Sequence, residues 1–194
     1  MDSDLEMAVF DNAVPPDLVA RVWEYSQQYA AWEFKNRGVE TDALTSWVAD
    51  LVNAYQDLDI ASKNLRWREL GVQMPFLHEI WELMVGRVDR TLQIQRIFLN
   101  GHTFGLGDSI HDDGGPGSYT FLLYVNPVWR PEWGGETMFY NVSVDDVVAA
   151  VLPKPGRVIF FDGRLPHAGR APARGFTGLR VTLAFQTVLV PHDA

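Results

Sequence analysis

Apolar residues in the first half of the chain recur every three or four positions, the spacing of one helix face. Three segments show this spacing: residues 15–29, 41–55 and 75–92. Pro15-Pro16-Asp17 and Thr41-Asp42 are suitable starts for the first two. The second segment follows the pattern most closely, with apolar residues at Leu44, Trp47, Val48, Leu51, Val52 and Tyr55. We predict three helices packed on a sheet, because a one-sided apolar stripe must be covered.

The pattern changes after residue 92. Short apolar and β-branched runs are separated there by clusters of Gly, Pro, Asn and Asp, which is typical of strands and turns. Strands are expected at residues 93–99, 119–126, 137–140, 147–152, 157–161 and 180–189. We therefore predict a mainly β fold with N-terminal helices, in one domain that spans residues 1–194. Residues 1–92 would be mainly helical support, and residues 93–190 a β-sandwich or barrel that the helices cover.

Composition narrows the range of partners. The 194 residues include 25 acidic and 16 basic side chains, which gives a formal net charge of -9. Duplex nucleic acids and anionic membranes usually require a basic face, so neither is expected as a partner. The absence of Cys excludes disulfides and thiolate metal sites, and leaves His and carboxylates as metal ligands. The N-terminus is acidic and no apolar run reaches transmembrane length, so we predict a cytoplasmic protein.

A His-x-Asp triplet lies in the segment Ile110-His111-Asp112-Asp113-Gly114-Gly115. In extended chain, residues i and i+2 point the same way, so His111 and Asp113 would project together while Asp112 faces away. An imidazole and a carboxylate on a common face are two ligands of a metal site. Taken alone, the triplet also fits a solvated acidic loop.

A third candidate ligand follows an apolar strand. Residues 155–161 form a turn that leads into a buried strand, and His167 comes just beyond it. Two His and one carboxylate make the facial triad of non-haem Fe(II) oxygenases, which leaves coordination positions open. A single His at this place would more often be structural.

Polar residues alternate with apolar ones in the strand at residues 180–189. Arg180 and Thr182 fall on one face, and the apolar residues fall on the other. An unpaired buried guanidinium is costly, and a dicarboxylate ligand would pair with it bidentately while Thr182 adds a donor. The row also fits an amphipathic strand at the sheet surface. In the strand at residues 119–126, the Tyr124 hydroxyl could reach the same ligand, or Tyr124 could belong to the core.

These pieces occur in one order: His-x-Asp, an aromatic strand, Gly-Gly-Glu, an apolar strand, a His and Arg-x-Thr. In this order the sequence resembles the prolyl-hydroxylase-like branch of the Fe(II)/2-oxoglutarate oxygenases, over about residues 93–190. The resemblance is carried by Ile110-His111-Asp112-Asp113, Phe121-Leu122-Leu123-Tyr124-Val125-Asn126, Gly134-Gly135-Glu136-Thr137, Pro155-Gly156-Arg157-Val158-Ile159-Phe160-Phe161, Pro166-His167 and Arg180-Val181-Thr182.

The resemblance implies a double-stranded β-helix, a jelly-roll of two sheets with helices packed outside. It implies that Fe(II) is held by His111, Asp113 and His167. It further implies that 2-oxoglutarate is bound by Arg180, Thr182 and Tyr124. With O2, such a centre oxidises an unactivated C–H and releases succinate and carbon dioxide. Related halogenases have a small residue in place of the carboxylate, so Asp113 favours hydroxylation, desaturation or ring closure over halogenation.

One departure from the family concerns the third ligand. His167 and Arg180 are further apart in sequence than in animal-type prolyl hydroxylases, and residues 171–178 between them resemble an extended loop. Arg170 or Arg174 could bind the co-substrate instead, but Arg180 has the better strand context.

The resemblance leaves the substrate open. We expect a small molecule of secondary metabolism as the substrate, with a peptidyl or prolyl hydroxylase as the alternative. Candidate substrate-binding residues are Arg96, His102, Arg164 and Arg170. Two further hypotheses are a non-catalytic jelly-roll binding protein and a cupin-like metalloenzyme, neither of which requires 2-oxoglutarate. The sequence does not predict the oligomeric state.

Overall fold

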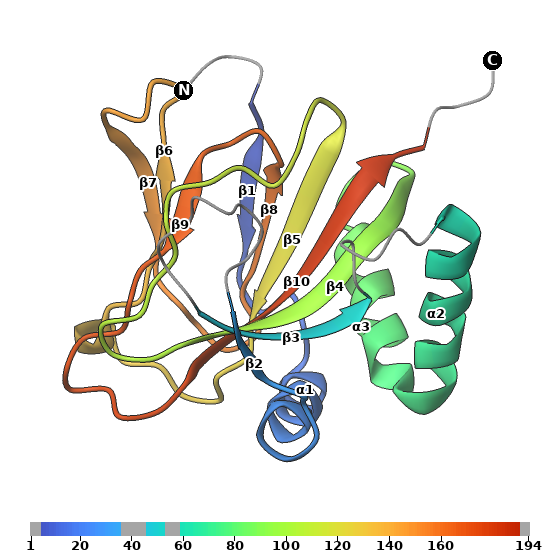
Figure 1. The fold of residues 1–194 in the computed structure, drawn as a ribbon, viewed down its shortest axis with the longest axis horizontal. Helices are drawn as coiled ribbons and strands as arrows, with labels where there is room; N and C mark the ends of the chain where they lie inside the picture. The colour runs from blue at the N-terminus through green and yellow to red at the C-terminus, as the bar shows by residue number, and fades with distance from the viewer. Residues whose placement is uncertain (1–4, 36–45, 53–58, 191–194) are drawn as a thin grey trace.

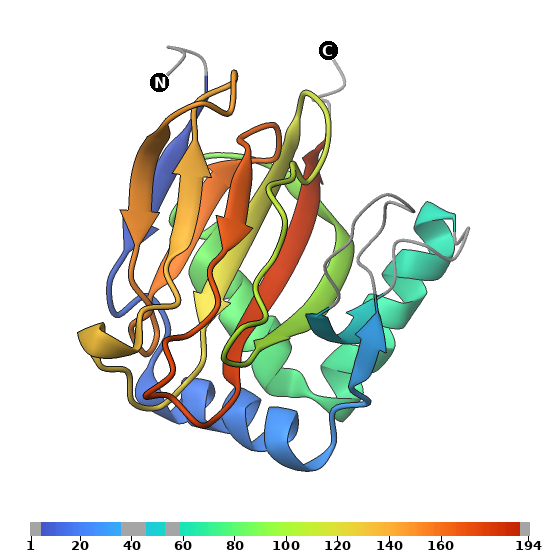
Figure 2. The same ribbon diagram turned by 60° about the vertical axis from the view of Figure 1, so that its left-hand side comes forward.

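Two antiparallel β-sheets face each other at the centre of the protein (Figures 1 and 2). The computed structural model describes residues 5–35, 46–52 and 59–190. Its strands are β1 (Met7–Phe10), β2 (Glu33–Lys35), β3 (Ser46–Val52), β4 (Leu92–His102), β5 (Ser118–Tyr124), β6 (Thr137–Tyr140), β7 (Val147–Val151), β8 (Val158–Asp162), β9 (His167–Gly169) and β10 (Arg180–Leu189). The major sheet has the order β1-β8-β5-β10-β4-β3-β2, and the minor sheet the order β7-β6-β9. This is the double-stranded β-helix expected from the sequence.

Helices α1 (Pro16–Gln28), α2 (Ile60–Gln73) and α3 (Pro75–Val85) pack on the side of the major sheet that faces away from the minor sheet (Figure 1). The prediction for α1 is confirmed, with Pro16 at its first turn, although Tyr29 lies just past its end and is exposed. Helix α3 ends at Val85, before Gly86, whereas the expected segment continued to residue 92. A short 3-10 turn, η1 (Pro131–Trp133), follows β5.

The helix predicted at residues 41–55 is wrong. The described part of this segment, Ser46–Val52, is strand β3, which pairs with β4. The rest of the prediction, from Thr41 to Leu44 and at Tyr55, lies outside the described residues. The first half of the chain thus contributes three strands to the major sheet besides its helices.

All six strands predicted after residue 92 are present, with ends that shift by up to three residues. The sequence did not predict α2, β1, β2 or β9, which are short or, in the case of α2, carry few buried apolar residues. In the part of the chain that the structure describes, no helix is long and apolar enough to cross a membrane.

Alternation along the central strands separates core from site. On β10, Val181, Leu183 and Phe185 point outward into the core shared with the helices. The alternate residues, including Arg180 and Thr182, point inward between the two sheets and line a pocket. The space between the sheets therefore holds the polar groups, as the period-two pattern predicted.

Candidate metal centre and adjoining pocket

Two of the predicted metal ligands, His111 and His167, lie side by side. They are opposite each other in an antiparallel bridge, closed by His111 N–H to the His167 carbonyl at 3.0 Å and the reverse bond at 2.9 Å. The Asp108 N–H also bonds the Gly169 carbonyl at 2.8 Å, so the chain around His111 runs along β9 and extends the minor sheet. Directly paired residues project to the same face, and Asp113 joins them two residues further on.

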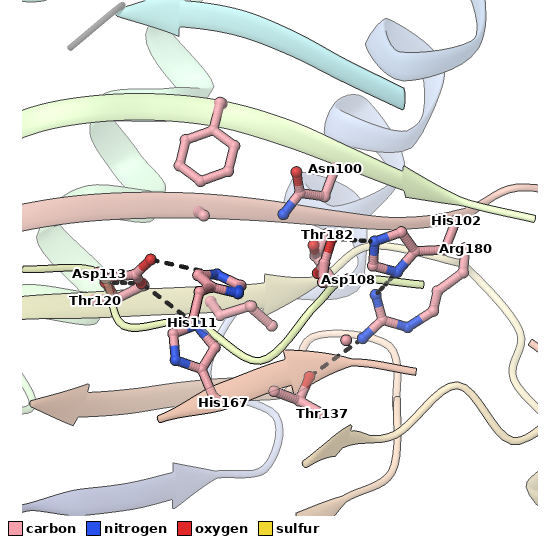
Figure 3. Close-up of a pocket in the computed structure, with 14 residues that line it drawn as sticks. Asn100, His102, Asp108, His111, Asp113, Thr120, Thr137, His167, Arg180 and Thr182 are labelled. Carbon is pink, nitrogen blue, oxygen red and sulfur yellow. Dashed lines mark hydrogen bonds and ion pairs between the residues drawn. The ribbon is translucent and has the colours of Figure 1, made fainter. Parts of the chain in front are cut away.

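His111, Asp113 and His167 place one potential ligand atom each within 4.8 Å of one another. Nε2 of His111 lies 3.7 Å from Asp113 Oδ1, and Nε2 of His167 lies 3.6 Å from Asp113 Oδ2 (Figure 3). Two imidazole nitrogens and a carboxylate converge there on one point. Such a donor set, with three positions left open, suits Fe(II).

Backbone carbonyls orient both rings in the same way. Nδ1 of His111 lies 2.9 Å from the Ser109 carbonyl, and Nδ1 of His167 lies 2.9 Å from the Leu165 carbonyl. A carbonyl only accepts, so each Nδ1 carries the proton and each Nε2 presents a lone pair to a metal. Burial also lowers the pKa of His167, against the raising effect of Asp113, which favours the neutral ring that a ligand requires.

The Asp113 carboxylate is fixed from the major sheet. Its Oδ2 accepts from the Thr120 hydroxyl at 2.6 Å, and its Oδ1 accepts from the Gln186 side-chain amide at 2.8 Å. Thr120 lies on β5 and Gln186 on β10, so two neighbouring strands hold the carboxylate between the sheets. Neither residue was predicted from the sequence in this role, although Gln186 has the same parity in β10 as Arg180 and Thr182.

Arg180 lies at the other end of the pocket (Figure 3) and is 1% exposed. Its Nε donates to the Gly135 carbonyl at 2.7 Å, its Nη1 to His102 Nδ1 at 3.2 Å and its Nη2 to the Thr137 hydroxyl at 3.2 Å. A guanidinium has five N–H donors, so one on each terminal nitrogen has no acceptor among the described residues. Burial lowers the Arg180 pKa, which marks the missing solvation of a buried cation.

Thr182 and Asn100 lie opposite each other on β10 and β4, and both line the pocket. The Thr182 hydroxyl and the Asn100 side-chain oxygen are buried without a hydrogen-bond partner in the described part of the chain. Buried polar groups are normally paired, so these atoms indicate a ligand. A carboxylate between Arg180 and Thr182 would satisfy two N–H donors and one hydroxyl. The residues present therefore fit 2-oxoglutarate.

Tyr124 lies in the core, which is one of the two positions that the sequence left open for it. Its hydroxyl lies 2.7 Å from the Thr137 hydroxyl and donates to the Val151 carbonyl at 3.0 Å. Its ring lies 5.4 Å from the Arg180 guanidinium carbon, where a cation–π contact forms. In this structure Tyr124 therefore supports Arg180 and Thr137 from the core, while neighbouring β5 residues line the pocket.

The long spacing between His167 and Arg180 has a structural use. Residues 171–178 fold back on η1, where the Ala173 N–H bonds the Trp133 carbonyl at 2.7 Å. The Phe176 ring then packs on Trp129 and Trp133, with ring centroids 4.7 and 4.9 Å away. A Cβ on Gly135 would lie 3.0 Å from both Trp129 and Arg180, so this aromatic cluster stands directly behind the guanidinium. The loop thus packs against the segment that carries Gly135, whose carbonyl accepts from Arg180 Nε.

The four candidate substrate-binding residues have separate locations. His102 lines the pocket and is buried. Arg96 is buried on the same face of β4 and makes a salt bridge of 2.8 Å with Asp50. Arg164 pairs with Asp162 at 2.6 Å, and Arg170 is exposed on a groove outside β9. Of the four, only His102 lines the described pocket.

Both the sequence and the fold are similar to those of known proteins. Residues 93–185 match the model of the 2OG-Fe(II) oxygenase superfamily. The fold is similar to a prolyl-4-hydroxylase from Pseudomonas putida (16% identity, TM-score 0.56, covering 97% of this chain and 95% of that chain). It is also similar to a prolyl hydroxylase from Trichoplax adhaerens, solved with a hypoxia inducible factor peptide fragment (15% identity, TM-score 0.61, covering 94% of this chain and 83% of that chain). A third similar structure is SnoN, a non-haem alpha-ketoglutarate-dependent epimerase from nogalamycin biosynthesis (13% identity, TM-score 0.60, covering 94% of this chain and 77% of that chain). No curated protein matches the sequence.

The chain contains a domain that matches the 2OG-Fe(II) oxygenase superfamily, at residues 93–185. It is a 2-oxoglutarate-dependent dioxygenase, which uses Fe(II), 2-oxoglutarate and O2. Its fold is shared with the prolyl hydroxylases, the branch that the sequence motifs indicated.

Proposed function

We propose that this dioxygenase hydroxylates, or otherwise oxidises, an unactivated C–H of a small molecule in secondary metabolism. In this proposal the iron ligands are His111, Asp113 and His167. Arg180 and Thr182 bind the distal carboxylate of 2-oxoglutarate. One observation carries the assignment. The unused guanidinium N–H groups of Arg180 and the unpartnered Thr182 hydroxyl lie at one end of the pocket, and the three potential metal ligands lie at the other.

Each group in the pocket has a distinct task. The bound metal and 2-oxoglutarate supply the oxidising chemistry, with succinate and carbon dioxide as by-products. The two imidazoles and the Asp113 carboxylate hold the ion, and Thr120 and Gln186 keep that carboxylate in place. The buried Arg180 orients the co-substrate by a bidentate pair.

The remaining pocket wall suits a C–H bond. Phe98, Leu122 and Ala184 line the pocket beside the polar groups and offer an apolar surface. This wall supports a substrate whose reacting part is a hydrocarbon group. The fold itself serves several substrate classes, since prolyl hydroxylases and the epimerase of nogalamycin biosynthesis share it. A peptide substrate is therefore the alternative that the test must distinguish.

The first experiment adds Fe(II) and then 2-oxoglutarate to the protein without oxygen and records the visible spectrum. We expect the weak charge-transfer band of metal-chelated 2-oxoglutarate. The band should be lost in His111→Ala and weakened in Arg180→Gln, while Arg130→Gln, an exposed arginine outside the pocket, should keep it. Metal binding without the band would favour the cupin-like hypothesis, and the lack of both in folded protein would favour a non-catalytic binding role.

The second experiment addresses the substrate. Succinate release is measured with a panel of small molecules and, separately, with proline-containing peptides. We expect stimulation by members of the small-molecule panel. Stimulation by peptides alone would replace the proposal with a peptidyl hydroxylase.

A further inference from the structure

The contact between Arg180 and His102 settles the protonation of the histidine. Arg180 is the first residue of β10 and lies directly opposite His102, the last residue of β4. Since an arginine only donates, the 3.2 Å contact from Nη1 makes His102 Nδ1 an acceptor without a proton. The ring is therefore neutral, and its proton is on Nε2. That atom lies 3.0 Å from Asp108 Oδ1, to which it donates.

A backbone hydrogen bond to the strand β9 fixes the position of Asp108. Its N–H bonds the Gly169 carbonyl at 2.8 Å, and its side chain is 8% exposed. A Cβ on Gly169 would come within 2.6 Å of the His102 ring and 2.8 Å of the Asp108 carboxylate. Only a glycine leaves room for both side chains there, so the strand that carries His167 also accommodates the pair.

An indirect link between Asp108 and Arg180 has an electrostatic advantage. A buried cation needs a nearby anion, and the charge of Asp108 raises the pKa of Arg180 against the lowering effect of burial. If the carboxylate paired with Arg180 directly, it would occupy the N–H donors that face the pocket. With His102 between them, the charge is balanced while one donor on each terminal nitrogen remains available.

We propose that Asp108 and His102 form a positioning pair that fixes the Arg180 guanidinium for the distal carboxylate of 2-oxoglutarate, without either residue contacting the reacting atoms. This inference rests on the proposed function, because it assigns 2-oxoglutarate to Arg180. It goes beyond that function in giving His102 a task other than substrate binding, and in giving Asp108 a task at all.

The test measures 2-oxoglutarate binding by calorimetry in the presence of Mn(II), which prevents turnover. Losing one hydrogen bond to a charged group costs about tenfold in affinity, so His102→Leu should raise the Kd for 2-oxoglutarate by about tenfold. The Kd for Mn(II) should stay unchanged. His102→Asn places an amide oxygen near the position of Nδ1 and should recover most of the affinity. Asp146→Asn removes an equal charge from an exposed turn and is the matched control.

A double-mutant cycle separates the pair from a general charge effect. If Asp108 acts mainly through His102, Asp108→Asn weakens 2-oxoglutarate binding clearly more in the wild type than in His102→Leu. In succinate-release assays the KM for 2-oxoglutarate should rise while kcat at saturation stays within about twofold, since the lost interaction is one of binding.

Three outcomes would overturn the inference. An unchanged 2-oxoglutarate Kd in His102→Leu removes the positioning role. A parallel loss of Mn(II) binding, or a failure of His102→Asn to recover affinity in folded protein, assigns His102 a structural role instead. Wild-type protein that binds Mn(II) but no 2-oxoglutarate overturns the proposed function itself, and this inference with it.

Discussion

At the scale of single residues, the pocket is defined by polar atoms that the protein leaves unpaired. Arg180 is the largest of these groups, and its fork shape matters as much as its charge. Replacement by Lys keeps the charge but offers a point donor in place of two parallel N–H groups. We predict that Arg180→Lys lowers 2-oxoglutarate affinity by about ten- to a hundredfold, the value of one to two charge-assisted hydrogen bonds. Calorimetry with Mn(II) checks this, with the exposed Arg130→Lys as control; equal affinity in both variants would contradict it.

Thr182 provides a prediction in which stability and binding change in opposite directions. Its buried hydroxyl has no partner among the described residues, and such a group costs about 1–3 kcal/mol. Thr182→Val keeps the shape and removes the hydroxyl. The free energy of unfolding of the ligand-free protein should therefore stay constant or rise, while 2-oxoglutarate binds several-fold more weakly. Urea unfolding and calorimetry measure the two quantities, and a clear loss of stability would show that the hydroxyl has a partner after all.

The predicted site residues are those that local sequence patterns can place. His111 and Asp113 share a face because they are two apart in extended chain, and Arg180 and Thr182 share one for the same reason. Asn100 and Asp108 became visible only through tertiary pairing, since the register of β4 against β10 and of the chain around Asp108 against β9 is set by contacts distant in sequence.

At the scale of secondary structure, β3 shows how a strand can imitate a helix. A bulge between Asp50 and Val52 interrupts its pairing with β4. Both faces of β3 are buried, since Val48 packs with Phe98 and Ala184 whereas Ala49 belongs to the core shared with the helices. The bulge adds a second adjacent pair, Leu51 with Val52, on the helix side. The resulting spacing of about three residues is close to that of a helix face, and the prediction at residues 41–55 failed for this reason.

The end of β8 offers a test of Arg164, which the sequence suggested as a substrate-binding residue. Its guanidinium bonds the buried Asp162 carboxylate at 3.0 and 2.6 Å. We predict that Arg164→Met lowers the free energy of unfolding by about 1–2 kcal/mol, because the buried Asp162 carboxylate loses the guanidinium and keeps the backbone N–H of residue 164. The KM for 2-oxoglutarate should not change. Arg170→Met, at an exposed position, serves as the control in the same unfolding assay.

The difference in free energy of unfolding between the wild type and Arg164→Met should depend on pH, because Asp162 is a titrating group. Burial would raise its pKa, but the hydrogen bonds and charge of Arg164 outweigh burial and hold the pKa below its ordinary value. A carboxyl group with a depressed folded-state pKa contributes stability above its unfolded pKa of about 3.9, and this is lost as the pH falls through the folded value. The gap between wild type and Arg164→Met should therefore narrow below about pH 4. A gap that is constant with pH would mean that Arg164 stabilises by packing alone.

At the scale of the whole molecule, the two sheets bring the proposed metal ligands of one sheet to the proposed co-substrate residues of the other. His111 and His167 belong to the minor sheet and its extension, whereas Arg180 and Thr182 belong to the major sheet. A co-substrate that contacts both would tie the sheets together.

Ligands that bind only the folded state stabilise it by about 2.7 kcal/mol at a concentration of a hundred times Kd, which corresponds to a rise in Tm of about 5–10 °C for a chain of this size. We therefore predict that Mn(II) and 2-oxoglutarate together raise the Tm by more than the sum of their separate effects. The excess arises because bound metal strengthens 2-oxoglutarate binding, and linkage requires the reverse effect to be equal. Thermal unfolding with each ligand alone and with both measures it. His111→Ala should abolish the excess, whereas purely additive shifts in the wild type would mean that the metal and 2-oxoglutarate occupy independent sites.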